Sequence, residues 1–346
     1  MKVPSKTIRH LLAAVAFCVS TATTVRASLS FVQSFGSSGT GSGRFSSPNG
    51  LALDNAGNIY VADSGNNRID RFNPANFAGT FTTFGSVGTG GGQFTNPYGV
   101  AVDSSGNVYV ADSGNNRIDR FNPANVLGTF TSFGTVGTGS GQFKFPSEVT
   151  LDSAGRLYVA DQNNARVDRF NPANFAGTFA SFGSLGAGSG HFAEVADVTL
   201  DSAGNVYVAD HNNHRIVRFN PSDFAGTFTT FGSQGSGSGQ FNYPSSLTLD
   251  ASGNIYVADE RNNRIDVFNP SDFAATFTSF GGFGTGNGQF DFPAEVVLDN
   301  LGNLYVADTR NNRIVQLSTA APEPAGSLLL LIGGALLALR RPRAAA

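Results

Sequence analysis

Short apolar runs separated by turns rich in glycine, asparagine and proline recur along this chain. In the first copy an apolar strand at 51–53 leads through the turn 54–58 to a β-branched and aromatic strand at 59–62. A third strand at 68–72, an Asn-Pro turn and a fourth strand at 80–84 follow. Glycine takes the left-handed conformation that tight hairpins need, and proline donates no ladder bond. Each copy therefore predicts four short antiparallel strands.

The copies follow one another at a constant step of 49 residues. One such unit cannot bury its own apolar face, so six of them predict an all-β, six-bladed β-propeller with four-stranded antiparallel blades. The last copy ends near Leu317 without a fourth strand, whereas a spare strand at about 30–36 precedes the first copy. We therefore expect this N-terminal strand to join the last blade and close the ring. The aspartates of the repeated Tyr-Val-Ala-Asp motif are Asp63, Asp112, Asp161, Asp210, Asp259 and Asp308.

Composition and charge narrow the function. The chain has 43 Gly, 31 Phe and no Trp, so phenylalanine must supply most of the large packing surface. Excluding the two terminal segments, the repeats hold 15 basic and 24 acidic residues, a net charge of −9. Such an acidic body argues against nucleic-acid binding. The single cysteine, Cys18, precedes the repeats, which therefore contain neither a disulfide nor a cysteine nucleophile.

The N-terminal segment 1–27 has the features of a secretory signal peptide. Lys2, Lys6 and Arg9 precede an apolar stretch, and the small residues around 25–27 form a plausible cleavage site. The repeats are therefore expected to be exported.

The C-terminal segment 319–346 has a Pro-Glu-Pro motif, an apolar run at 325–339 and a basic end. As a helix the run spans roughly 22 Å, against about 30 Å of hydrocarbon, so it is short for a permanent anchor. The segment resembles the PEP-CTERM sorting signal of Gram-negative bacteria. This implies an exosortase-type processing enzyme, transient membrane contact through helix 325–339, and delivery to the cell surface or extracellular matrix. An ordinary anchor, the alternative, leaves the repeats on the same side. The residues concerned are Pro322, Glu323, Pro324, Arg340, Arg341 and Arg343.

The repeats resemble those of the NHL family across 29–318. Gly-Gln-Phe before a proline, the Asp-x-x-Gly-Asn turn, Tyr-Val-Ala-Asp, Asn-Asn-Arg-Ile and a final Phe-Gly all match. The fourth copy departs once, with Val195 in place of the proline. The expected domains are thus a signal peptide (1–27), an NHL propeller (28–318) and a sorting segment (319–346).

Residues that are identical in all copies, such as Asp63 and Arg68, are predicted to be structural. Positions that differ between copies point to a site. The glycine-rich loop entering each inner strand and the loop after Tyr-Val-Ala-Asp are expected to share one face, where polar variety gathers on blades three to six around the channel mouth. The candidate ligand-binding residues are Glu148, Asp197, His211, Glu260, Arg261, Glu295 and Arg310.

Metal binding is a further possibility, although no cofactor is expected. Glu148, Asp197 and Glu295 could surround Ca²⁺, which wants six to eight oxygens, and related six-bladed hydrolases hold calcium in the channel. The alternative is three solvated carboxylates on an acidic surface. The family resemblance also includes a zinc lyase that uses histidines from several blades. Here the repeats offer three, all on loops of blade four: His191, His211 and His214.

Two functions follow from these features. The first is an exported, non-enzymatic binding or scaffold protein of a Gram-negative surface or matrix, with a protein, peptide or glycan partner. The second is an exported metal-dependent lyase or hydrolase with its site at the channel mouth. A sensor module is a weaker third option, because the sequence contains no cytoplasmic signalling domain.

Overall fold

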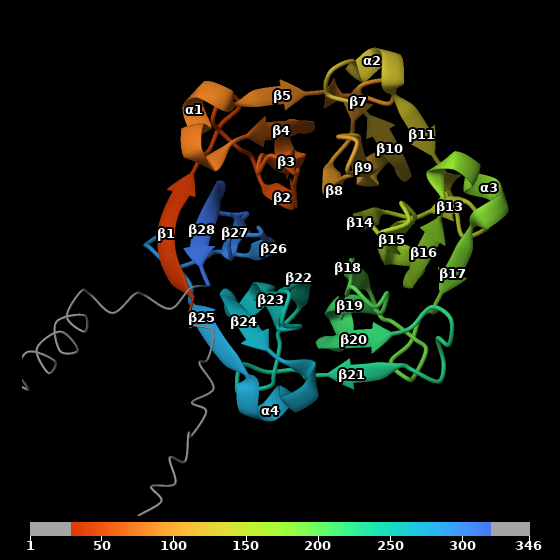
Figure 1. Cartoon of the computed structure of the whole chain (residues 1–346), viewed down its shortest axis with the longest axis vertical. Coiled ribbons are helices and arrows are strands. Elements are labelled where there is room, and N and C mark those ends of the chain that lie inside the picture. Colours follow the sequence, from red (N-terminus) through yellow and green to blue (C-terminus); the bar gives the residue numbers. More distant parts are fainter. Residues whose placement is uncertain (1–28, 320–346) are drawn as a thin grey trace, which may run out of the picture.

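Six blades surround a central channel in the computed structural model, which describes residues 29–319 (Figure 1). Each blade is a four-stranded antiparallel sheet, so the six-bladed propeller predicted from the repeat is confirmed. The predicted signal peptide and the predicted helix 325–339 of the sorting segment lie outside these residues. Within residues 29–319, no helix is both long and apolar enough to cross a bilayer.

The first strand of each blade lies beside the channel and the fourth lies at the circumference (Figure 1). Blade one comprises β2 (Pro48–Leu53), β3 (Ile59–Asp63), β4 (Arg68–Phe72) and β5 (Thr82–Phe84). Blade two comprises β8 (Pro97–Val102), β9 (Val108–Asp112), β10 (Arg117–Phe121) and β11 (Thr131–Phe133). Blade three comprises β14 (Pro146–Leu151), β15 (Leu157–Asp161), β16 (Arg166–Phe170) and β17 (Ala180–Phe182). Blade four comprises β18 (Val195–Leu200), β19 (Val206–Asp210), β20 (Arg215–Phe219) and β21 (Thr229–Phe231).

Blade five has the same form, and blade six is completed by the N-terminal strand. Blade five comprises β22 (Pro244–Leu249), β23 (Ile255–Asp259), β24 (Arg264–Phe268) and β25 (Thr278–Gly281). Blade six comprises β26 (Pro293–Leu298), β27 (Asn303–Asp308), β28 (Arg313–Ser318) and β1 (Ser30–Phe35). Two pairs of very short parallel strands lie in the connecting loops: β6 (Ser86–Val87) with β7 (Gln93–Phe94), and β12 (Thr135–Val136) with β13 (Gln142–Phe143).

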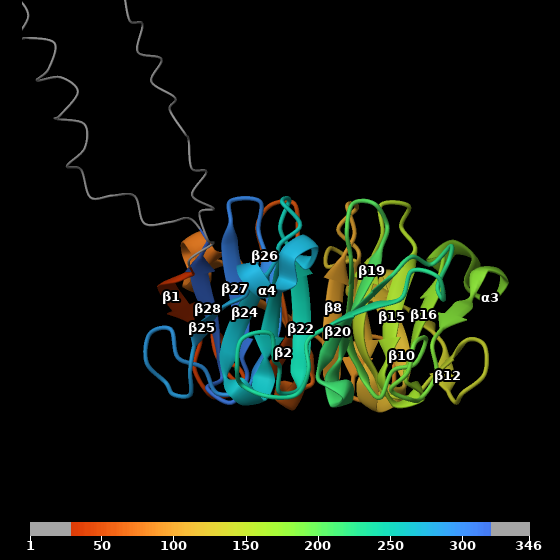
Figure 2. The same ribbon diagram turned by 90° about the horizontal axis from the view of Figure 1, so that it is seen from below.

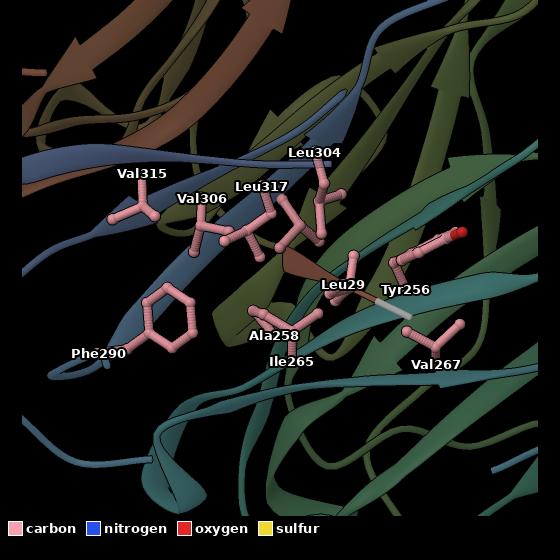
Figure 3. Close-up of a cluster of buried hydrophobic side chains, with 11 residues drawn as sticks. Leu29, Tyr256, Ala258, Ile265, Val267, Phe290, Leu304, Val306, Val315 and Leu317 are labelled. Carbon is pink, nitrogen blue, oxygen red and sulfur yellow. The ribbon is translucent and has the colours of Figure 1, made fainter. Parts of the chain in front are cut away.

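The ring closes as the sequence predicts. Strand β1 pairs antiparallel with β28, in a register that places Ser30 opposite Ser318 and Phe35 opposite Ile314. Leu29 is buried with Leu317 and other side chains of blades five and six (Figure 3). Phe35 is buried in the next cluster, between blades six and one. The N-terminal strand therefore seals two neighbouring cores.

The hydrophobic core consists of six clusters, each built from the facing sides of adjacent blades. Phenylalanine dominates them: Phe45 and Phe72 are fully buried, as are their counterparts along the chain. The Phe-Gly pair that ends each copy has a steric cause. Gly36 has a φ of +85°, and a Cβ there would lie 2.3 Å from Cε2 of Phe45.

The fourth strand is shorter than the sequence predicts, because a helical turn precedes it. In blade one the helix α1 (Phe77–Thr80) includes Thr80, so the strand begins at Thr82 rather than at 80. Oδ1 of Asn76 accepts a hydrogen bond from N of Gly79, and this cap favours the turn. The equivalent helices are α2 (Val126–Thr129), α3 (Phe175–Thr178) and α4 (Phe273–Thr276).

The two faces of the ring carry different loops (Figure 2). The glycine-rich entry loop and the loop after Tyr-Val-Ala-Asp meet on one face, where N of Ser46 donates to Oδ1 of Asp63 at 2.7 Å. We call this the mouth face. The hairpin turns meet on the other, where Nδ2 of Asn73 donates to Oδ1 of Asn58 at 3.2 Å. The described chain ends on this turn face, since N of Thr319 donates to O of Gly302.

A buried arginine–aspartate network holds each entry loop to its blade. In blade one Nε of Arg68 lies 3.1 Å from Oδ2 of Asp63, and its terminal nitrogens donate to O of Thr40 and O of Arg44. The same contacts recur in every copy, so the repeated Asp and Arg residues are structural.

Four blades bury a second aspartate beside this arginine, and two have valine there instead. Desolvation by burial raises the pKa of all four aspartates from 3.8 to about 8. Although Nε of Arg68 lies 3.0 Å away, Oδ1 of Asp70 accepts no hydrogen bond from any residue of the described region. The four aspartates are Asp70, Asp119, Asp168 and Asp266, and the valines are Val217 and Val315.

These aspartates make the folded protein more stable at acidic than at alkaline pH. Because their pKa is higher in the folded than in the unfolded chain, folding binds protons, and stability falls as pH rises from about 4 through about 8. We expect a lower melting temperature at pH 9 than at pH 5.5. The change Asp70→Val, which copies Val217, should stabilise the protein by about 1–3 kcal/mol at pH 9 and less at pH 5.5. Calorimetry at both pH values checks this; equal effects at the two would contradict it.

Candidate functional site

Six residues, one from each inner strand, surround the channel at the mouth face. Each sits at an irregularity of the strand pairing, such as that between Pro146 and Glu148, which turns the side chain out of the regular pleat. Blades one and two have glycine at this position, and the other four have polar side chains. The residues are Gly50, Gly99, Glu148, Asp197, Ser246 and Glu295.

Glu148, Asp197 and Glu295 form a buried carboxylate layer across the channel. Their exposed fractions are 7%, 3% and 8%, so the alternative of solvated surface carboxylates is wrong. Backbone and hydroxyl donors hold them: N of Leu247 donates to Oδ2 of Asp197 at 2.6 Å, and Oγ of Ser246 donates to Oε1 of Glu295 at 2.6 Å. The layer is thus a fixed part of the channel wall.

The carboxylate layer holds protons more tightly than free acids do. Burial raises the pKa of Asp197 to about 6. Burial, followed by repulsion from Asp197, raises the pKa of Glu148 and Glu295 well above the ordinary value. Three carboxyls that share a small buried space cannot all ionise at neutral pH.

The side chain of Glu148 occupies space that is free because blade two has a glycine, Gly99, at the equivalent position. A Cβ on Gly99 would lie 2.6 Å from both Cα and Oε2 of Glu148. N of Val149 donates to Oε1 of Glu148 at 2.9 Å. The glycine therefore makes room for the neighbouring carboxylate.

A cavity of about 170 Å³ opens on the mouth side of the carboxylate layer, and we call it the mouth cavity. A second cavity of about 230 Å³ lies along the channel, between the inner strands. Glu148 and Glu295 line both cavities, whereas Asp197 lines only the second. The mouth cavity is lined by Asn49, Gly50, Tyr98, Ser147, Glu148, Gln162, Glu194, Ala196, His211, Ser245, Glu260, Ala294 and Glu295.

Blade four breaks the repeat where it forms this cavity. In blade two, Oδ1 of Asn67 accepts a hydrogen bond from N of Asn96, which has a left-handed φ of 50°. The counterpart of Asn67 at the blade three–four boundary is Ala165, which has no acceptor side chain. Val195 likewise replaces the proline of the other copies. Glu194 therefore has neither a side-chain acceptor for its backbone N–H at position 165 nor a proline after it at position 195.

Glu194 consequently takes a different place from its counterparts. It lacks the left-handed φ of its counterparts, such as Asn96. N of His211 donates to its carbonyl at 2.9 Å, a contact that residues 29–319 otherwise show only in blade six, where N of Thr309 donates to O of Phe292 at 3.3 Å. Its carboxylate accepts hydrogen bonds from Nε2 of Gln162 and Nδ2 of Asn212. A break in the repeat thus brings an extra carboxylate to the mouth cavity.

His211 is neutral in this setting. Desolvation lowers the pKa of its imidazole, opposed by the charge of Glu194. Nδ1 lies 3.1 Å from O of Pro244, so this nitrogen carries the proton and Nε2 remains an acceptor.

The structure brings together most of the candidate residues. Glu148, His211, Glu260 and Glu295 line one cavity, and Asp197 lies immediately below it. The two arginines lie on the rim instead. Arg261 stacks on Tyr243 with Cζ 4.0 Å from the ring centre. Arg310 stacks similarly on Phe292, and its Nη1 lies 3.7 Å from Oδ1 of Asp291.

Sequence reasoning missed Tyr98 and Glu194. Tyr98 has counterparts that also vary, and this variation was a usable signal: the residues at its position are Asn49, Tyr98, Ser147, Ala196, Ser245 and Ala294. For Glu194 the signal was that two positions that act on it, Ala165 and Val195, both depart from the repeat.

The three histidines do not form one cluster, although His211 and His214 both contact the ring of Tyr243. His191 lies on the entry loop with Nδ1 3.0 Å from Oγ of Ser184. His214 takes the structural role of the asparagine that it replaces, because its Nδ1 accepts from N of Tyr243 at 3.1 Å. Across residues 29–319, no group of three or more His, Cys, Asp or Glu side chains is placed to hold a metal ion.

Comparison with known proteins agrees with this architecture. The NHL repeat model matches residues 45–72, 94–121, 192–219, 241–268 and 290–317. The chain carries NHL repeats. The equivalent segment of blade three, 143–170, is not among the matches, although it has the same strands. A search of curated proteins finds no match.

Solved structures similar to this NHL propeller share little sequence with it. A Bacteroides thetaiotaomicron protein of unknown function has 17% identity and a TM-score of 0.65, covering 84% of this chain and 76% of its own. An inactive variant of virginiamycin B lyase from Staphylococcus aureus, solved with quinupristin, has 17% identity and a TM-score of 0.56, covering 81% and 82%. A Xanthomonas campestris gluconolactonase has 13% identity and a TM-score of 0.59, covering 80% and 87%. At these identities the likeness shows the fold alone.

Proposed function

We propose that this NHL propeller is an exported binding protein of the cell surface or extracellular matrix of a Gram-negative bacterium, which engages a protein, peptide or glycan partner through its mouth face. The observation that carries the proposal is the contrast between the two faces. The hairpin turns barely vary, whereas the non-repeating polar side chains gather around one cavity. A rigid scaffold with one face whose side chains differ from blade to blade is suited to binding a specific partner.

The position of the ends of the described chain supports a mouth face that is directed away from the membrane. Ser30 pairs with Ser318, and Thr319 contacts the turn at Gly302, so the described chain begins and ends on the turn face. A tail that contacts the membrane, or is cut there, would leave the mouth face directed away from it. An exosortase-type enzyme would then reach its processing site without covering the mouth cavity.

Cell fractionation combined with capture tests the proposal. The chain should appear in surface or matrix fractions, and it should retain matrix material on a column. A Tyr98→Ala/Glu260→Gln variant should retain less. The matched control is Asp272→Asn, because Asn76 already fills the equivalent turn-face position. A chain confined to the cytoplasm, or equal retention by all three proteins, would contradict the proposal.

A metal-dependent lyase or hydrolase is the second candidate. Buried carboxyls with raised pKa beside a cavity are common at catalytic sites, and similar folds include a lyase and a gluconolactonase. Elemental analysis of the purified protein separates the candidates. Stoichiometric calcium or zinc, lost when Glu148, Asp197 and Glu295 are changed to alanine, would favour the enzyme; a metal-free protein that still captures its partner would favour binding.

A further inference from the structure

The mouth cavity offers hydrogen-bond acceptors but few free donors. The amide and serine hydroxyl donors that line it all bond to acceptors within the protein. What remains toward a ligand is the carboxyl group of Glu260, the imidazole acceptor of His211 and one free donor, the hydroxyl of Tyr98. The committed bonds are Asn49 Nδ2 to Ser64 Oγ (3.0 Å), Ser147 Oγ to Ala196 O (2.8 Å), Ser245 Oγ to Pro293 O (3.0 Å) and Gln162 Nε2 to Glu194.

Two lining side chains stand out because their polar atoms have no hydrogen-bond partner among the described residues, although the ring of Tyr98 packs against Phe145 with the ring centres 5.4 Å apart. Glu260 occupies the position from which Ser64, Ser113 and Thr309 donate to the next blade. A carboxylate cannot donate in this way, and in the region 29–319 Glu260 has neither a side-chain hydrogen bond nor an ion pair within 4 Å. The hydroxyl of Tyr98 likewise has no hydrogen-bond partner among the described residues.

Glu260 and Tyr98 come from blades five and two, yet they face one cavity. Glu194 lines the same cavity, and after burial the charges of Glu260 and Glu194 both help to raise the pKa of Tyr98. No lysine or arginine lines the cavity. An uncommitted carboxylate and an aromatic ring therefore meet further carboxyl groups inside the cavity, whereas the two arginines whose charges act on Glu260, Arg261 and Arg310, lie on the rim.

We propose that the mouth cavity binds a small organic cation, an alkylammonium or guanidinium group, which donates to Glu260 and packs against the ring of Tyr98. This rests on the proposed binding function and specifies its ligand. Such a group supplies the donors that the cavity lacks, and an aromatic face attracts it. An anion brings only acceptors, so it could accept a hydrogen bond from the hydroxyl of Tyr98 but would leave the carboxylate of Glu260 unpaired and be repelled by it.

The size of the cavity supports a single cationic group. Its 170 Å³ is below the roughly 300–1,000 Å³ of pockets that enclose whole drug-sized ligands. The group can come from a free amine or from a lysine or arginine side chain of a partner protein that reaches into the mouth. These two sources share one chemistry, and the experiment below separates them.

Binding should depend on pH. Burial raises the pKa of Glu260 to about 7, and the groups facing it are Arg261, Arg310, Glu194 and Asp259. A bound cation favours the ionised carboxylate, so binding should release protons near pH 7 and weaken as pH falls below that value.

Isothermal titration calorimetry of the full-length chain tests this inference. The probes are n-butylammonium and methylguanidinium, with glucose and acetate as neutral and anionic comparisons. Both cations should bind at pH 8.5, more weakly at pH 5.5. Glu260→Gln, which copies Gln162 at the equivalent position, should weaken binding roughly tenfold or more. Asp272→Asn, which removes one charge from the turn face, should leave it unchanged.

The outcomes separate this inference from the proposed function. Cation binding that Glu260→Gln weakens and Asp272→Asn does not would support both. Binding of glucose or acetate instead, abolished by Tyr98→Ala, would keep the binding function and overturn the cationic ligand. No binding by any probe would overturn the cation and remove the cavity from the binding function. Putrescine and a lysine-containing peptide then distinguish the sources: tighter binding of the peptide indicates a protein partner, and tighter binding of putrescine a free amine.

Discussion

A chain that begins at residue 37 is expected to lose most of its thermal stability, whereas one that begins at residue 29 should melt like the whole protein. The first truncation removes β1, which pairs with β28 and covers two neighbouring cores. Its loss exposes β28 as an unpaired edge and leaves the ring open. Phe35 is 5% exposed, and the change Phe35→Ala alone should lower the free energy of unfolding by about 3–5 kcal/mol.

Differential scanning calorimetry of the two truncated chains measures this effect. Total stabilities of such domains are only about 5–15 kcal/mol, so the loss of β1 should produce a large fall in melting temperature. Similar melting temperatures for the two chains would show that the N-terminal strand does not close the ring.

Changing Arg166 to methionine is expected to destabilise the protein by about 3–5 kcal/mol at pH 9, because it leaves two buried aspartates without a cation. Nε of Arg166 lies 3.0 Å from Oδ2 of Asp161 and 3.1 Å from Oδ1 of Asp168. Its terminal nitrogens also donate to O of Thr138 and O of Gln142, each at 2.7 Å. Acid should reduce the effect, since burial raises the pKa of Asp168 to about 8 and the leftover carboxyl is protonated below that value.

Blade four provides the matched comparison for this change. Arg215 bonds Asp210 at 2.7 Å, but Val217 replaces the second aspartate there. Arg215→Met should therefore cost less than Arg166→Met at pH 9, and the difference should narrow at pH 6. Adding Asp168→Val to Arg166→Met should recover the difference. Chemical denaturation at the two pH values measures all three; equal costs for the two arginines would contradict the argument.

The fold was predictable from the sequence because the 49-residue period repeats the same pattern of strands and turns six times. Strand pairs, turn residues and the missing fourth strand at Leu317 all point to one closed ring. The four-residue helices were not predictable in the same way. A turn such as α1 is too short to show helical periodicity, and it depends on a cap from Asn76 that also suits a plain turn.

The site was predictable in part, for a physical reason. Comparison of the copies found the varying positions Glu148, His211, Glu260 and Glu295, because variation marks residues released from the scaffold. It did not find Glu194, whose placement depends on the loss of one hydrogen bond across a blade boundary. That bond joins residues 29 positions apart, as Asn67 and Asn96 show, and becomes visible only when the blades are packed together.

A crystal structure of the protein soaked with n-butylammonium at pH 8.5 tests the central claim most directly, because it shows where the ligand sits. The account predicts an ordered ammonium group in the mouth cavity, with its nitrogen about 3 Å from a carboxylate oxygen of Glu260 and its alkyl chain against Tyr98. An empty mouth cavity at saturating ligand, or the amine bound on the turn face, would contradict it.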